Sequence, residues 1–256
     1  MTTTTSALAR PASPLKRITS VAKLHFANPW TTLGLPWIIL GVIFVGSLTI
    51  WWLIYSALSP EQRVGALQGT EFGGSSFFIF IYMMVVAIQA ISITFPFALG
   101  YGVTRRDYYL GSALAFVALA VIYTTGLTVL GAIEKATNGW GMGGTMFAPI
   151  YFGESAPERI FVTFVLFLFF LFFGSAIAAV WVRWKATGVT VFFIIVGAFL
   201  VGLIVLVTFT DSWFAVGDTF VDLGVLGVAS WSLVLTAISG VAGFVLLRRA
   251  TPRNAA

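Results

Sequence analysis

Six long apolar runs, none of which contains Asp, Glu, Lys, Arg or His, dominate this chain of 256 residues. An α-helix needs about 20 apolar residues to cross the roughly 30 Å of hydrocarbon in a bilayer. Backbone groups in lipid must form their hydrogen bonds within the segment, so each run favours a helix. The sequence therefore predicts an all-α polytopic membrane protein with six transmembrane helices. The runs cover residues 33–57, 76–100, 109–133, 160–182, 187–209 and 225–247.

The composition supports the same class. Charged residues make up 9% of the chain and hydrophobic residues 59%, whereas a soluble domain carries about 25% charged residues. The chain has no cysteine, which excludes disulfides, thiolate zinc sites and a cysteine nucleophile. In a soluble protein the net charge of +5 would favour nucleic acid. Here the charge follows the membrane topology, so we expect no nucleic-acid partner.

The basic residues predict the orientation. With the N-terminus in the cytoplasm, 11 of the 14 basic residues lie on the cytoplasmic side, and Asp107 is the one acid there. This positive-inside bias predicts a multi-pass protein of the cell (plasma) membrane with both termini cytoplasmic. The inner set is Arg10, Lys16, Arg17, Lys23, Arg105, Arg106, Arg183, Lys185, Arg248, Arg249 and Arg253, and the outer set is Arg63, Lys135 and Arg159.

The chain ends flank one transmembrane domain, residues 29–247. Residues 1–13 are rich in Thr, Ser, Ala and Pro and are expected to be disordered. Residues 14–28, PLKRITSVAKLHFAN, place apolar side chains at helical spacing opposite basic and hydroxyl side chains, which predicts an amphipathic helix on the membrane surface. An ordinary basic flank that only sets topology is the alternative. Residues 248–256 form a basic cytoplasmic tail, and no signal peptide is expected.

Several kinds of chemistry have no residues to perform them. The chain lacks the G-x-x-x-x-G-K-[ST] phosphate loop and the H-E-x-x-H and G-x-S-x-G motifs. Its single histidine, His25, falls in the amphipathic segment, where we expect an ordinary interfacial side chain and no metal site. No carboxylate lies inside a predicted span, which argues against an ion-driven carrier. We therefore expect no enzyme activity and no cofactor in this chain.

A compact charged segment, FPFALGYGVTRRDYYLG at residues 95–111, separates the second and third runs. Arg105 and Arg106 can pair with carboxylates of another protein, and the tyrosines Tyr101, Tyr108 and Tyr109 suit either an interface or the lipid headgroup region. A turn that only sets topology, with an aromatic belt, is the alternative reading.

This segment and the six-span layout resemble the membrane subunit of an ABC-type exporter of the type-2 permease (ABC-2) family. The resemblance implies that residues 14–28 form the family's elbow helix and that residues 212–224 include short re-entrant helices. It implies a loop that docks on a separate ABC ATPase subunit, present in two copies that hold ATP and Mg, and a second permease subunit in a homo- or heterodimer. The implied docking residues are Val103, Thr104, Arg105, Arg106, Asp107 and Tyr108.

The implied function is export of an apolar or amphipathic substrate, such as a drug, a lipid or a hydrophobic peptide. Polar residues in the second and third spans, Gln89, Ser92, Thr94 and Thr124, are candidates for the substrate path, although hydrogen bonds between helices would explain them equally. The loop at residues 134–158 is either a lid or an interfacial loop. A membrane anchor or sensor subunit that transports nothing is the alternative function.

Overall fold

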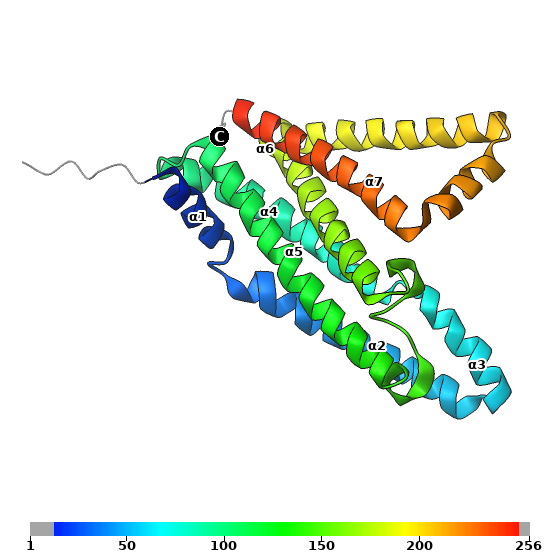
Figure 1. Cartoon of the computed structure of the whole chain (residues 1–256). Helices are drawn as coiled ribbons and strands as arrows, with labels where there is room; N and C mark the ends of the chain where they lie inside the picture. The colour runs from blue at the N-terminus through cyan, green and yellow to red at the C-terminus, as the bar shows by residue number, and fades with distance from the viewer. Residues whose placement is uncertain (1–12, 251–256) are drawn as a thin grey trace, which may run out of the picture.

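The computed structural model describes residues 13–250, and within this range every regular element is a helix (Figure 1). The expected all-α class is confirmed for these residues. The α-helices are α1 (Pro14–His25), α2 (Leu35–Ala57), α3 (Pro60–Gln68), α4 (Phe78–Gly100), α5 (Arg105–Ala136), α6 (Ala156–Phe209) and α7 (Trp213–Arg249). Single turns occur at η1 (Trp30–Gly34), η2 (Gly69–Phe72), η3 (Ser75–Phe77), η4 (Gly139–Gly143) and η5 (Ile150–Phe152). The expectations for the N-terminal segment before Ser13 and for residues 251–256 lie outside the described residues.

Within the described range, five helices are long and apolar enough to cross a membrane: Trp30–Ala57, Ser75–Gly100, Arg105–Ala136, Ala156–Phe209 and Trp213–Arg249. The sequence predicted six, and the difference lies in α6, which joins the runs 160–182 and 187–209. The connecting residues 183–186 contain neither Pro nor Gly, so no residue type in this stretch marks the end of a helix. Lys185 nevertheless has a φ of 57° and a ψ of −150°, which are not helical, so α6 consists of two helical segments that meet at a kink.

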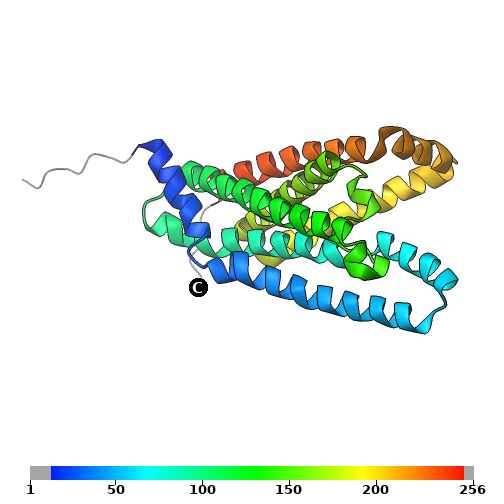
Figure 2. The ribbon, with the colours of Figure 1, turned by 60° about the horizontal axis from the view of Figure 1, so that its bottom comes forward.

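The last helix, α7, bends in a similar way. It joins the expected span 225–247 to the preceding segment 212–224, and it departs from helical geometry at Gly224, where φ is 59°. Glycine adopts such a positive φ without a steric penalty. We call residues 186–223, which lie between the two bends, the arm. Figure 1 shows the arm, coloured yellow to orange, extending away from α2, α4 and α5, and in Figure 2 its yellow and orange segments again meet at one tip.

The core lies where α4, α5 and the first half of α6 meet. Gly174 allows the backbones of α6 and α4 to approach closely, because a Cβ there would lie 2.5 Å from the carbonyl oxygen of Met84. Ser175, Ala178 and Ala179 on the same helix are fully buried. Small residues at this spacing are typical of tight helix packing in membranes.

The start of the first long helix is secured by tyrosines from two other helices. Residues 30–34 form a wide π turn, which leaves backbone carbonyl groups without the usual α-helical partners. The hydroxyl of Tyr82 on α4 donates to the carbonyl of Thr31 at 3.2 Å, and that of Tyr123 on α5 donates to Thr32 at 2.6 Å. These bonds join α2 to the core of the bundle.

Candidate functional site

The turn between α4 and α5 is shorter than the sequence suggested. The expected spans end at residue 100 and begin again at residue 109, but only Tyr101–Thr104 lies between the two helices, with no separate helix in that part of the chain. Thr104 caps α5, because its hydroxyl accepts the backbone N–H of Asp107 at 3.1 Å. An acid in the first turn also suits the positive end of the helix dipole. Both features start α5 at Arg105.

The six residues implied to dock on another protein divide into exposed and buried positions. Thr104 and Arg106 are exposed, and Val103 and Arg105 are half-buried. Asp107 and Tyr108 are buried inside the chain. Of these six residues, Thr104 and Arg106 therefore face outward most fully, beside the exposed Tyr101 and Gly102 of the turn itself.

The buried residues of this segment join the start of α5 to two other helices. A carboxylate oxygen of Asp107 accepts a hydrogen bond from Nε of Arg17 on α1 at 2.7 Å. The Tyr108 hydroxyl lies 2.6 Å from the Thr94 hydroxyl on α4 and donates to the Ala90 carbonyl at 3.3 Å. Asp107 and Tyr108 therefore hold α1 and α4 against α5.

The same segment also contacts the end of α7. The guanidinium of Arg105 donates to the carbonyl of Arg248 at 2.9 Å, and the Tyr109 hydroxyl donates to the carbonyl of Gly240 at 2.5 Å. We call the end of the bundle formed by α1, the start of α5 and the end of α7 the basic end (Figure 1). It carries Lys16, Arg17, Lys23, Arg105, Arg106, Arg248 and Arg249.

His25 is not an interfacial side chain as we expected, because it is buried between α1 and α5. Its Nε2 lies 2.7 Å from the hydroxyl of Ser112, and its ring lies 6.0 Å from the rings of Tyr108 and Phe116. Burial lowers the pKa of His25 to about 4, so the imidazole is neutral at physiological pH. The helix α1 ends at His25, three residues before the expected end at residue 28.

The structure does not bring the four candidate path residues together. Gln89 is exposed on the surface of α4, whereas Thr124 is buried on α5. The Ser92 hydroxyl donates to the Ile88 carbonyl of its own helix, and Thr94 contacts Tyr108. Within the described chain, these residues therefore line no common polar path.

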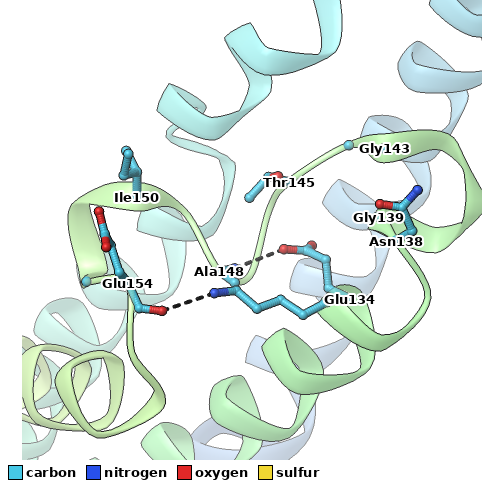
Figure 3. A pocket seen from close by; sticks show the side chains of 11 residues that line it. Glu134, Asn138, Gly139, Gly143, Thr145, Ala148, Ile150 and Glu154 are labelled. Carbon is cyan, nitrogen blue, oxygen red and sulfur yellow. Dashed lines mark hydrogen bonds between the residues drawn. The ribbon is translucent and has the colours of Figure 1, made fainter. Parts of the chain in front are cut away.

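At the other end of α5, a pocket of about 550 Å³ lies beside the long loop that leads to α6 (Figure 3). Glu134 is buried there, and its carboxylate accepts backbone N–H groups of Met146 at 2.9 Å, Phe147 at 3.1 Å and Ala148 at 3.0 Å. The indole N–H of Trp140 donates to the same carboxylate at 3.3 Å. Glu134 therefore organises this loop.

Sequence reasoning missed this role for Glu134. In the sequence, Glu134 is one of several charges in a predicted outer loop. The sequence does not indicate which backbone N–H groups will point towards its carboxylate. The open side of the pocket carries Asn138 and Glu154, together with Lys135, whose ammonium donates to the Glu154 carbonyl at 3.3 Å. In the part of the chain that the structure describes, no group of three or more His, Asp or Glu residues is placed to hold a metal ion.

The fold and these contacts define a class of protein: the described residues form only helices, five of which are apolar and long enough to span a membrane, and the bundle has a compact basic end. Comparison with known proteins adds no narrower assignment, because no family model, no curated protein and no solved structure matches the chain.

Proposed function

We propose that this chain is the permease subunit of an ATP-driven ABC exporter in the plasma membrane, working with a separate ATPase subunit. The observation that carries the proposal is the α4–α5 turn with the first residues of α5, which expose Thr104 and Arg106 at the basic end of the bundle. The likeness of residues 95–111 to the docking segment of type-2 permeases gives that exposed turn its role. The ATPase would hold ATP and Mg, and this chain would supply no catalytic group.

The contacts of the turn suit it to transmit movement. A displacement imposed on Arg106 would act on the first turn of α5, which is bonded to α1 through Asp107, to α4 through Tyr108 and to α7 through Arg105. Closure of an ATPase pair would therefore shift four helices together. Such a shift would drive alternating access if the two arrangements differ in their contacts with the ATPase.

In this proposal α6 crosses the membrane twice. At 1.5 Å per residue, a straight helix of 54 residues would be about 80 Å long, more than twice the hydrocarbon thickness. A bend at Lys185, next to Arg183, would place the only charged residues between the two apolar halves of the helix at a membrane surface. With this bend the chain has six crossings, and both ends of the described chain lie on the cytoplasmic side.

A second permease subunit would complete the assembly. From Arg183 to Val228 no residue is buried, and Phe209, Phe214 and Val221 are 80% exposed or more. Gln89 is exposed on the surface of an apolar helix, and an amide is costly to leave in lipid. We propose that part of these surfaces faces a second permease and that the substrate, an apolar or amphipathic molecule, passes between the two subunits.

A second candidate function is a membrane anchor or sensor subunit that transports nothing. It is favoured by one observation: Ser92, Thr94 and Thr124 do not line a common path within the chain. An anchor would use the same exposed turn, so the two functions differ in whether the partner hydrolyses ATP and whether that hydrolysis depends on the turn.

The test is Arg106→Glu, with Arg249→Glu as the matched control. Both arginines are exposed at the basic end, but only Arg106 lies next to the turn. We expect Arg106→Glu to reach the membrane normally and to lower both the amount of co-purified ATPase and its ATP hydrolysis at least about tenfold, which corresponds to 1.4 kcal/mol. Arg249→Glu should retain both. Equal behaviour of the two variants would contradict a docking role for the turn.

A further inference from the structure

A groove of about 420 Å³ lies at the basic end, between α1 and the end of α4 with the turn that follows it. One part of its lining is polar and comes from the start of α1: Lys16, Arg17 and Ser20. The rest is largely apolar and includes Leu24 farther along α1 and Phe97 near the end of α4. The groove therefore changes from cationic to apolar along its length.

Its cationic part has more positive than negative charge. Lys16 is exposed, and the side chain of Arg17 remains 40% exposed although its Nε bonds to Asp107. The Asp107 carboxylate balances one of the two cations, so one positive charge remains at the groove. Such a site attracts an anionic group.

Its apolar part suits a hydrocarbon chain. Phe97 is 55% exposed at the end of a helix long and apolar enough to span a membrane, and its ring packs 4.7 Å from that of Tyr101. Leu24 lies two turns along α1 from Arg17, on the same face of the helix. A free phosphate ion would fill only the cationic part of the groove, whereas a phospholipid would fill both parts.

We propose that this groove binds one anionic phospholipid, with its phosphate at Lys16 and Arg17 and one acyl chain along Leu24 and Phe97. Basic pockets between helices at a membrane surface are suited to anionic headgroups, and each Lys or Arg near the surface contributes about 1 kcal/mol. The bound lipid joins α1 to the end of α4, next to the turn that exposes Arg106. This inference does not depend on the proposed function.

The test counts lipids retained by the whole purified chain in detergent micelles, by native mass spectrometry, with phosphatidylglycerol or phosphatidylcholine added. The decisive variant is Lys16→Gln, and its matched control is Lys23→Gln, which removes the same charge from an exposed site on α1 outside the groove. We expect one phosphatidylglycerol on the wild-type chain and on Lys23→Gln, and about fivefold less on Lys16→Gln, as loss of about 1 kcal/mol implies. Phosphatidylcholine should be retained much less.

A second variant addresses the apolar part. Ser20 is exposed, and its hydroxyl donates to the Lys16 carbonyl of its own helix, so Ser20→Phe should fill the groove without unfolding α1. We expect it to lose phosphatidylglycerol while keeping all local charges.

Equal effects of Lys16→Gln and Lys23→Gln would show only general attraction by charge and would overturn the proposal. So would equal retention of phosphatidylcholine, displacement of the lipid by millimolar inorganic phosphate, or loss of a co-purified protein from Lys16→Gln with lipid retention unchanged.

Discussion

At the scale of single residues, the hydrogen bonds of Glu134 predict a clear effect on stability. Its buried carboxylate accepts three backbone N–H groups and one indole N–H, and a neutral amide cannot accept all of them. We expect Glu134→Gln to lower the free energy of unfolding by about 2–3 kcal/mol, because hydrogen bonds to a charged acceptor are lost and buried donors remain. Thermal unfolding in detergent measures the change.

Glu154→Gln is the control for that experiment. Glu154 lines the same pocket, but its side chain is exposed, so the substitution should leave the unfolding midpoint nearly unchanged. An unfolding midpoint for Glu134→Gln as high as that of the control would show that the carboxylate does not organise the loop.

Because His25 is buried, we expect the free energy of unfolding to depend on pH. The pKa of His25 is lowered from its ordinary value of 6.5 to about 4 by burial, so the unfolded chain binds a proton at a higher pH than the folded chain does. The free energy of unfolding should therefore be highest above pH 6.5, fall by about 3 kcal/mol as the pH drops towards 4, and change no further from this group below 4.

To test this expectation, the unfolding midpoints of the wild type and of His25→Gln are measured between pH 4 and pH 8 and compared. The variant has no titrating ring at this position, so its profile should be flatter than that of the wild type over the same window. Parallel profiles would mean that His25 titrates alike in the folded and unfolded chains.

At the scale of elements, the packing of α1 on α5 depends on Gly111. A Cβ at this position would lie 2.5 Å from Cβ of Val21 and 2.6 Å from the carbonyl oxygen of Ile18. We expect Gly111→Ala to cost about 1–3 kcal/mol and to loosen α1. Limited trypsin digestion would then cleave faster at the basic residues of α1. Gly41→Ala, where a Cβ meets no neighbour within 4 Å, should be cleaved at the wild-type rate, and equal rates for both variants would contradict the packing.

Capping patterns in the sequence predict the starts of the helices better than the boundaries of the apolar runs do. Ser59 and Gln62 form a capping box at the start of α3, and Ser155 and Glu158 form another at the start of α6. The S-x-x-Q and S-x-x-E patterns are visible in the sequence, and so is the T-x-x-D pattern that begins α5. Hydropathy alone overlooked them, because a capped helix extends past the apolar run into charged residues.

The bends and the buried ion pair could not be predicted in this way. Nothing local marks Lys185 as a residue with positive φ, and the partner of Asp107 is Arg17, 90 positions earlier in the chain. The sequence therefore indicated a charged segment between two long apolar helices, but not which of its side chains are buried. That division depends on α1 folding back onto α5, which is a tertiary contact.

At the scale of the whole molecule, the proposed topology can be tested by cysteine labelling, since the natural chain has no cysteine. We introduce Arg106→Cys, Lys185→Cys and Lys135→Cys singly and label intact cells with a membrane-impermeant maleimide. If α6 crosses twice, positions 106 and 185 are protected and position 135 is labelled. Labelling of position 185 together with position 135 would contradict two crossings by α6.

The most direct test of the central claim is the composition of the complex. The tagged chain is extracted from its own membranes in mild detergent, and the proteins that co-purify with it are identified by mass spectrometry, beside a known ABC exporter as a positive control. We expect a stoichiometric soluble protein that carries the G-x-x-x-x-G-K-[ST] phosphate loop, together with a second permease or a second copy of this chain. Recovery of this chain without any such ATPase, while the control complex remains intact, would contradict the account.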